Sequence, residues 1–313
     1  QLADLLLGTS ISEGDATKSF TIGSLVALVT PMSPSGDVDY ASLEKLIDWH
    51  IAEGTNGIVS VGTTGESSTL NPIEHIDVID FTVKHVKKRI PVIAGTGANS
   101  TQEAIELTQE SKQLGSDYAL LVTPYYNKPN QKGLIAHYEA IANAVDIPQI
   151  LYNVPSRTAC DLLPSSTQIL SEHTNIVGIK EALDSMDRIK ELVEISNQAR
   201  GNFLIYSGDD PTFMESLTLG AHGVISVAAN IVPKSISDIC SMVKANKISD
   251  AKELNFNNSE LFRLLFIESN PIPAKWMLYK MGLIQNAIRL PLIELDGTYH
   301  HDVMSEIKQL GLL

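Results

Sequence analysis

Short apolar segments alternate with amphipathic helical patterns along most of this chain, and this alternation limits the possible fold more than any other feature. Each apolar segment is rich in Val, Ile and Leu and is closed by Gly, Pro, Thr or Asn, as expected of strands buried on both faces. The eight segments of this kind are Ser24–Pro31, Gly57–Gly62, Pro91–Gly97, Tyr118–Pro124, Pro148–Pro155, Ile176–Ala182, Phe203–Asp209 and Gly223–Ala229. Helical spacing of apolar residues is seen between them in Tyr40–Glu53, Pro72–Lys88, Thr101–Leu114 and Gly133–Ala144.

Eight strand–helix units in series predict an α/β protein built on a parallel (β/α)8 barrel, the TIM barrel. The alternative is an open, doubly wound sheet. However, no GxGxxG motif follows the first strand, and Gly95-Thr-Gly97 lacks the third glycine of a dinucleotide-binding turn. After about residue 249 only helical patterns remain. We therefore expect an N-terminal extension at 1–20, the barrel at 21–248 and a C-terminal helical region at 249–313.

Charge and cysteine content exclude several classes of function. The chain has 23 basic and 37 acidic residues, a formal net charge of −14, and no basic cluster that would follow a phosphate backbone, so we expect no nucleic-acid partner. No apolar stretch approaches the roughly 20 residues that cross a membrane, and residues 1–20 make a weak signal peptide. The two cysteines, Cys160 and Cys240, suggest neither a disulfide framework nor a zinc site. We expect a cytoplasmic protein with no membrane partner, no metal and no cofactor.

Lys180 is the residue that points most directly to chemistry. It follows the apolar run at 176–179, where burying an ammonium group is expensive. Burial favours the uncharged amine, which can attack a ketone to form a Schiff base. In a (β/α)8 barrel the catalytic residues lie at the carboxyl ends of the strands, where this lysine is expected. The alternative is a lysine whose side chain reaches solvent from the end of its strand.

Polar side chains at the ends of other strands supply the groups that such chemistry needs. Tyr152, expected on the strand next to Lys180, can exchange protons during Schiff-base formation, or it can be an aromatic residue of the barrel core. Thr63 and Thr64 can bind a carboxylate or pass protons, or they can belong to a capped glycine turn. Arg157 suits bidentate binding of a carboxylate, or it can pair with an acid at the surface.

Two consecutive acids, Asp209 and Asp210, follow the seventh strand segment. A metal site there would need a third oxygen ligand, and none is evident in the sequence. We expect these acids to cap the helix that begins near Pro211.

These motifs together resemble the pyruvate-dependent class I aldolases of the N-acetylneuraminate lyase superfamily. The resemblance runs from about Thr21 to Leu313 and is nearest to the branch that condenses pyruvate with L-aspartate-4-semialdehyde on the route to diaminopimelate and lysine. Its motifs are Gly62-Thr-Thr-Gly-Glu66, Ala94-Gly-Thr-Gly-Ala-Asn99, Thr123-Pro-Tyr-Tyr-Asn127, Tyr152-Asn-Val-Pro155, Gly178-Ile-Lys-Glu-Ala182, Ser207-Gly-Asp-Asp210 and Asn270-Pro-Ile-Pro273.

The resemblance implies a role for each of the residues at the strand ends. Lys180 is expected to form the Schiff base with pyruvate. Tyr152, Thr63 and Tyr126 are expected to form a proton relay, with Tyr126 reaching into the neighbouring subunit of a homotetramer built as a dimer of dimers. This family needs no cofactor.

The remaining implied roles concern substrate binding. Thr64 is expected to bind the pyruvate carboxylate and Arg157 the carboxylate of the semialdehyde. Gly208 and the carbonyl group of Ile225 are expected to line the pocket. Sugar-acid lyases of the superfamily do not usually carry this arginine, because their second substrate is a sugar; they remain the alternative within the enzymes. A barrel that binds pyruvate or lysine without turnover is the alternative of another class.

The resemblance also implies an inhibitory site for L-lysine at the interface of the tight dimer. Its expected residues are Ser67, His75, Asn99, Glu103 and Tyr125. Pro72 departs from the pattern, because inhibited members can carry a histidine there. An ordinary polar interface is the alternative at these positions.

Overall fold

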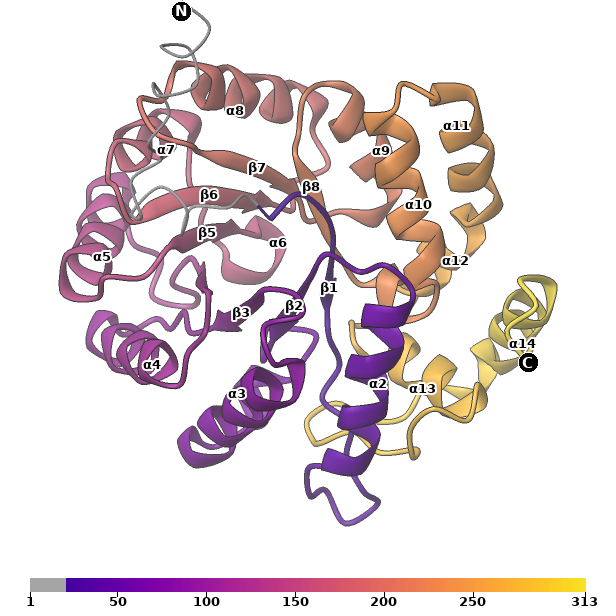
Figure 1. Ribbon diagram of the computed structural model, residues 1–313. Coiled ribbons are helices and arrows are strands. Elements are labelled where there is room, and N and C mark those ends of the chain that lie inside the picture. The colour runs from indigo at the N-terminus through magenta and orange to yellow at the C-terminus, as the bar shows by residue number, and fades with distance from the viewer. Residues whose placement is uncertain (1–20) are drawn as a thin grey trace, which may run out of the picture.

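A computed structural model describes residues 21–313 of the chain (Figure 1). The expected N-terminal extension at 1–20 lies outside the described residues, and the division at 21–248 and 249–313 stays a prediction. No helix in the described part of the chain is both long and apolar enough to span a membrane.

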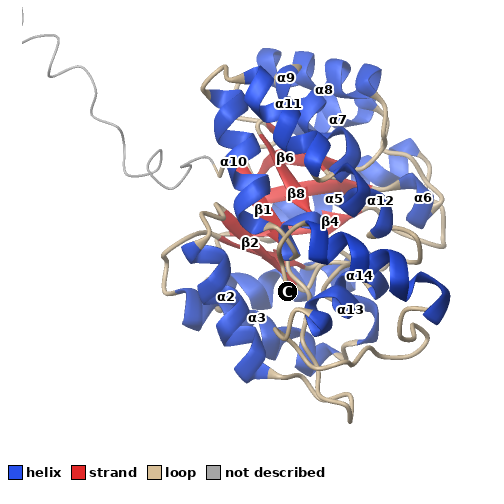
Figure 2. Cartoon of the chain, turned by 90° about the vertical axis from the view of Figure 1, so that its right-hand side faces the viewer, coloured by secondary structure: helices blue, strands red, loops and turns tan. Residues whose placement is uncertain are grey.

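Eight parallel strands close into a barrel in the order of the chain, so the predicted (β/α)8 fold is confirmed and the open sheet was wrong. The strands are β1 (Gly23–Ala27), β2 (Gly57–Ser60), β3 (Val92–Gly95), β4 (Tyr118–Val122), β5 (Gln149–Asn153), β6 (Ile176–Glu181), β7 (Leu204–Ser207) and β8 (Gly223–Ser226). The pairing of β8 with β1 leaves no open sheet edge. Figure 2 shows the strands inside a layer of helices.

The strands end earlier than expected, most clearly at the first one. The predicted segment runs to Pro31, whereas β1 ends at Ala27. Beyond that point the side chain of Asn230 replaces a neighbouring strand: its Nδ2 donates to the carbonyl oxygen of Ala27 at 2.7 Å, and its Oδ1 accepts from the amide of Val29 at 3.1 Å. Apolar content therefore continues into the loops at the rim, where the strand ladder has already stopped.

Helices cover the outside of the barrel, and short 3-10 turns follow three of the strands. The helices between strands are α2 (Tyr40–Ala52), α3 (Pro72–Val86), α4 (Thr101–Gln113), α5 (Gln131–Ala144), α6 (Pro155–Thr158), α7 (Pro164–Ser171), α8 (Met186–Gln198) and α9 (Phe213–Thr218), and α10 (Pro233–Lys244) follows β8. The 3-10 turns are η1 (Ser67–Thr69), η2 (Asp210–Thr212) and η3 (Ala228–Asn230).

A run of helices completes the chain: α11 (Ile248–Asn257), α12 (Ser259–Leu264), α13 (Ile272–Lys280), the 3-10 turn η4 (Gly297–Tyr299) and α14 (His300–Gln309). These helices pack against one another and against the barrel, with α13 in contact with both η3 and α14. A buried ion pair ties this region to the loop after β2, because the ammonium of Lys275 on α13 donates to the carboxylate of Glu66. The C-terminal helices thus reach the carboxyl ends of the strands, where active sites of this fold lie.

Strand pleating decides which side chains enter the barrel. Leu25, Tyr152 and Ile225 belong to the apolar cluster inside the barrel, whereas Val26 packs between the sheet and the helices. Along β6, Ile179 packs with the outer helices. Because successive side chains of a strand point to opposite faces, Lys180 faces the interior and Glu181 faces outward.

Candidate active site

Lys180 and Tyr152 lie side by side at the carboxyl ends of β6 and β5. They are partners in the strand register, and the lysine ammonium lies 4.0 Å from the centroid of the tyrosine ring. Each side chain is only 6% exposed, so the alternative in which Lys180 reaches solvent was wrong. Within residues 21–313 no carboxylate pairs with this ammonium. A buried amine without a counter-ion, next to a phenol, is suited to nucleophilic attack on a carbonyl group.

Gly208 provides the space that the lysine occupies. It follows β7, and a methyl group built at its Cα would lie 2.9 Å from Cε of Lys180 and 3.1 Å from Cγ. Its amide donates to the carbonyl oxygen of Glu181 at 2.7 Å, which holds the turn against β6. The structure therefore gives this glycine a steric function beside the predicted nucleophile.

A charged cluster fixes the end of β6 from the outer side. Glu181 is 1% exposed and accepts hydrogen bonds from Asn153 Nδ2 and from Nη1 of Arg188, the latter at 2.9 Å. Both guanidinium nitrogens of that arginine also donate to Asp161. Because Glu181 is adjacent to Lys180 in the strand, this cluster limits the movement of the backbone that carries the lysine. In the sequence Asn153 and Glu181 appeared only as parts of motifs, and no local pattern predicts that they meet Asp161 and Arg188.

The loop after β2 is held by the C-terminal region. The hydroxyl of Thr64 accepts a hydrogen bond from Asn270 Nδ2 at 2.9 Å, and the carbonyl oxygen of Asn270 accepts one from Arg157 at 3.3 Å. Asn270 therefore links two residues that the sequence predicted to bind carboxylates. The sequence indicated Asn270 only as part of a motif, and no local pattern predicts that it joins these two segments.

Arg157 lies on the short helix α6 and is exposed. The only hydrogen bond of its side chain within the described chain goes to the carbonyl oxygen of Asn270, and the side chain forms no ion pair there. The alternative, an arginine paired with a surface acid, was wrong for residues 21–313. The guanidinium keeps most of its donors free for a ligand.

A cavity of about 390 Å³ opens beside these residues, at the ends of β2, β4 and β5. Thr63 and Arg157, predicted for catalysis and substrate binding, line it together with most of the residues predicted for lysine binding. The latter are Ser67, His75, Glu103 and Tyr125. Asn99 is not part of the lining, but its Nδ2 donates to the carbonyl oxygen of Tyr125 at 3.1 Å. Pro72 also lines the cavity, so the departure from the family pattern faces this space.

Two groups of this cavity have altered acidity. Burial lowers the pKa of His75, whose Nε2 lies 2.7 Å from the carbonyl oxygen of Gly95, so the neutral ring is favoured. Burial and the nearby charge of Glu103 raise the pKa of Tyr125. The carboxylate of Glu103 is the one negative charge of the lining.

Tyr126 differs from the other predicted catalytic residues. Its side chain is 89% exposed and makes no hydrogen bond within the described chain. The fold of one chain therefore does not bring it to Lys180 and Tyr152.

Ile225 and the acids after β7 complete the predicted set. Ile225 is 2% exposed, with its side chain inside the barrel. Asp209 lies at the N-cap position of η2, and its Oδ2 accepts a hydrogen bond from Thr212 Oγ1 at 2.6 Å, whereas the capping role expected for Asp210 was wrong. Asp210 accepts hydrogen bonds from Ser226 Oγ and from the amides of Val227 and Ala228, because the loop after β8 lies against it. This carboxylate ties the ends of β7 and β8 together.

A (β/α)8 barrel with a buried, unpaired lysine and a tyrosine at the carboxyl ends of neighbouring strands has the architecture of a Schiff-base-forming lyase of the class I aldolase type. Comparison with known proteins agrees. The model of the dihydrodipicolinate synthetase family matches residues 21–310. A 4-hydroxy-tetrahydrodipicolinate synthase from Stutzerimonas stutzeri is 53% identical over 291 residues, which are 93% of this chain and 99% of that protein.

Solved structures give the same result. The chloride-inhibited dihydrodipicolinate synthase of Acinetobacter baumannii, complexed with pyruvate, matches with a TM-score of 0.92 and 53% identity, over 94% of this chain and 100% of that one. The enzyme of Cyanidioschyzon merolae with lysine bound matches with a TM-score of 0.89 and 37% identity, over 94% and 100%. The chain belongs to the dihydrodipicolinate synthetase family. It is a lyase.

Proposed function

We propose that this chain condenses pyruvate with L-aspartate-4-semialdehyde to give 4-hydroxy-tetrahydrodipicolinate, with Lys180 as the residue that holds pyruvate. The observation that carries the proposal is the buried, unpaired ammonium of Lys180, 4.0 Å from the ring of Tyr152. The uncharged amine attacks the ketone carbon of pyruvate, and loss of water from the carbinolamine leaves the Schiff base. Loss of a methyl proton then gives an enamine, whose carbon attacks the aldehyde carbon of the semialdehyde and regenerates the Schiff base. The amino group of the semialdehyde then attacks the Schiff-base carbon, which closes the ring and releases the amine of Lys180.

Proton transfer in these steps is assigned to Tyr152, Thr63 and Tyr126. The hydroxyl that leaves the carbinolamine needs a proton, and the alkoxide formed from the aldehyde needs another. The ring of Tyr152 has its centroid 4.0 Å from the amine. Thr63 lines the cavity at the same rim. Tyr126 is exposed on one chain, and we assign it to the site of a neighbouring subunit.

Substrate binding is assigned to the residues around this pair. Thr64, held by Asn270, binds the carboxylate of pyruvate, and Arg157 binds the carboxylate of the semialdehyde with its free guanidinium donors. Gly208 leaves room for the lysine chain, and we assign the carbonyl group of Ile225 to the wall of the substrate pocket. We also propose that the chain forms a homotetramer, in which the exposed Tyr126 reaches a neighbouring subunit. The free thiols of Cys160 and Cys240 support a cytoplasmic location, because thiols stay reduced in that compartment.

A coupled assay tests the activity directly. Purified enzyme with pyruvate and L-aspartate-4-semialdehyde is expected to form product. The product is measured by its reduction in a second, coupled enzymatic reaction that consumes a nicotinamide cofactor. N-Acetylneuraminate, offered alone under the same conditions, is expected to give much slower release of pyruvate. Faster cleavage of the sugar acid than condensation of the semialdehyde would reverse the assignment in favour of the sugar-acid lyases.

We also assign L-lysine as an inhibitor that binds the 390 Å³ cavity. The α-ammonium of lysine would pair with Glu103, the one acid of the lining. Glu103→Gln is expected to weaken inhibition by about tenfold or more, because a charged hydrogen bond is lost. Glu110→Gln, an exposed acid of the same helix that does not line the cavity, is the matched control. Equal inhibition of both variants would exclude Glu103 from the lysine site.

A further inference from the structure

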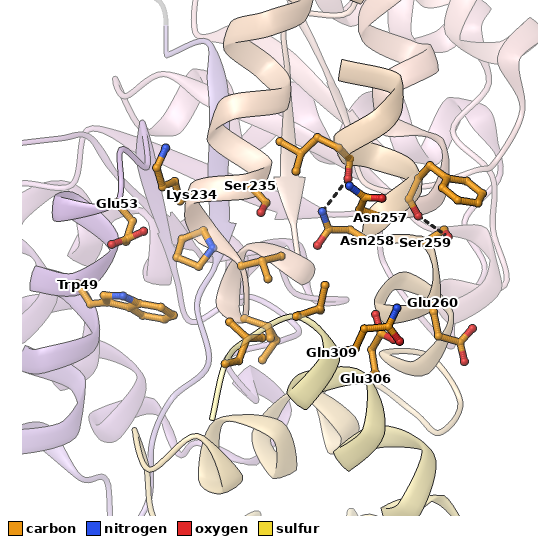
Figure 3. A pocket seen from close by; sticks show the side chains of 17 residues that line it. Trp49, Glu53, Lys234, Ser235, Asn257, Asn258, Ser259, Glu260, Glu306 and Gln309 are labelled. Atoms are coloured by element: carbon orange, nitrogen blue, oxygen red, sulfur yellow. Dashed lines mark hydrogen bonds between the residues drawn. The ribbon is translucent and has the colours of Figure 1, made fainter. Parts of the chain in front are cut away.

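A second and larger cavity, of about 650 Å³, lies outside the barrel between α2, α10 and the C-terminal helices (Figure 3). Its walls come from the end of α2, the start of α10, the junction of α11 and α12, and the end of α14. None of its lining residues belongs to the set assigned to the active site or to lysine inhibition. The volume is in the range of small-molecule sites. A ligand in this cavity would therefore contact none of the residues assigned to catalysis or to lysine inhibition.

The charged groups of this cavity are mostly acidic. Glu53, Glu260 and Glu306 line it, and Lys234 is the one basic residue of the lining. The ammonium of Lys234 is 2.7 Å from Asp238 and points to solvent, with 67% of its side chain exposed. Figure 3 shows Glu53 and Lys234 at one end, and Glu260 with Glu306 at the other. At the second end Glu260 pairs with Arg263, so Glu306 is the carboxylate of the lining that has no cationic partner among the described residues.

Glu306 on α14 is the unusual member of this group. It is 6% exposed, yet its carboxylate has no hydrogen bond and no cationic partner in the described part of the chain. Burial and the nearby Glu260 raise the pKa of its carboxyl group. Glu260 itself is satisfied, because its carboxylate accepts two hydrogen bonds from Arg263. The carboxylate oxygens are not among the fully enclosed unpartnered atoms of residues 21–313, so they are accessible from the cavity, and a cation placed there would pair with a carboxylate that no described residue neutralises.

A second buried acceptor lines the same cavity without a donor. Asn258 is 2% exposed, and its Oδ1 has no hydrogen-bond partner within residues 21–313. Its Nδ2 is used by the carbonyl oxygen of Leu254 at 2.8 Å, which fixes the orientation of the amide. Oδ1 is enclosed by the protein, so Asn258 adds a polar acceptor to this wall without contacting a ligand directly, and the accessible acceptor of the cavity is the carboxylate of Glu306.

Apolar side chains form the rest of the wall. Trp49 lies at one side, and Leu254, Leu310 and Leu312 approach from the C-terminal helices. Phe256, also in the lining, keeps 76% of its side chain exposed. A ligand that fits has a hydrocarbon body as well as a cationic head. A bare metal ion fits poorly, because the one group of described residues with metal-ligand spacing is Glu44, Asp48 and His85, which lies elsewhere.

We propose that this cavity binds a small amphipathic primary amine, with its ammonium group on the carboxylate of Glu306 and its hydrocarbon chain against Trp49 and the leucines. The ammonium supplies three donors, which suit the two oxygens of a carboxylate. This site is independent of the condensation reaction.

The test is calorimetric titration of the full chain with n-hexylammonium chloride and, in parallel, with 1-hexanol, a neutral molecule of nearly the same shape. The amine is expected to bind the wild-type protein with a Kd on the order of 1 mM, and the alcohol much more weakly. Glu306→Gln keeps the shape and removes the charge, and is expected to weaken amine binding about tenfold or more. Glu253→Gln, on the exposed side of α11, is the matched control and is expected to bind normally.

A second variant places the cation inside the protein. Leu310→Lys puts an ammonium four residues after Glu306, a spacing at which the two side chains meet. It is expected to abolish hexylammonium binding and to raise the melting temperature. Equal binding of amine and alcohol, undiminished amine binding in Glu306→Gln, or no amine binding to the wild-type protein would each overturn the proposal.

Discussion

Two lysines are buried in the described part of the chain, and their surroundings are opposite. Lys275 is 4% exposed and forms an ion pair with Glu66, which is 3% exposed. Lys180 is 6% exposed and has a tyrosine ring and a glycine next to it, with no acid. A paired lysine stays charged and holds two segments together, whereas an unpaired one is free to act as a nucleophile. The counter-ion, more than burial, separates the structural lysine from the reactive one.

The largest effect is expected from Lys180→Ala. Loss of the nucleophile should lower kcat by about 10⁴-fold, equal to roughly 5.5 kcal/mol of transition-state stabilisation. The melting temperature should change little, because no buried acid loses its partner. Activity assays with thermal unfolding measure both quantities. Retained turnover in this variant would break the comparison.

Lys275→Met should affect mainly stability, whereas Lys180→Ala affects mainly activity. Removing one partner of a buried ion pair costs about 3–5 kcal/mol of unfolding free energy, since Glu66 is left charged and unpaired. Denaturant unfolding measures this loss. The double variant Lys275→Met with Glu66→Gln should recover most of it, and failure of the second change to restore stability would show that the pair is not the cause.

Gly208→Ala tests whether the reactivity of Lys180 depends on the space that this glycine leaves for its side chain. The added methyl group would lie 2.9 Å from the lysine Cε, so the amine must move. A displacement of this size should cost up to about 100-fold in kcat, with little loss of stability. Gly201→Ala, where an added methyl group meets nothing within 4 Å, is the control. Equal kinetics for the two alanine variants would contradict the proposed steric function.

The smallest effect, taken per pH unit, concerns His50, a buried ionisable residue whose ring makes no hydrogen bond among the described residues and has no proposed catalytic role. Both ring nitrogens lack hydrogen bonds within residues 21–313, and burial lowers its pKa to about 3. The folded state favours the neutral ring, so its stability is complete above the unfolded pKa, about 6.5, and falls as the pH drops from there toward 3. The slope from this residue is at most about 1.4 kcal/mol per pH unit. Chemical unfolding between these pH values should show a shallower slope in His50→Phe, and identical slopes would contradict it.

The barrel could be predicted because its eight buried strands appear in the sequence as apolar segments at regular intervals. The positions of Lys180 and Tyr152 could be predicted because the carboxyl ends of the strands in this fold meet at one rim. The sequence did not predict the strand ends, since the residues after Ala27 are as apolar as those before it. Asn230 stops that strand by a contact from a distant segment. Asp210 was misinterpreted for the same reason, because its partners follow β8.

The ion pair of Lys275 and the bridging contacts of Asn270 join segments 113 to 209 residues apart, and no local pattern encodes them. The second cavity has the same origin. The sequence pattern around Glu306 predicts an ordinary acidic residue on the surface of a helix. Only the packing of α2, α10 and α14 places it in a cavity without a cationic partner. Pairwise contacts between distant segments were thus the part of the site that sequence reasoning missed.

Trapping with borohydride tests the central claim most directly. The wild-type protein is incubated with pyruvate, reduced, digested and analysed by mass spectrometry. The account predicts one reduced pyruvate adduct, on the peptide that contains Lys180, and an unmodified Lys275. An adduct that persists in Lys180→Ala, or that maps to Lys275, would contradict it.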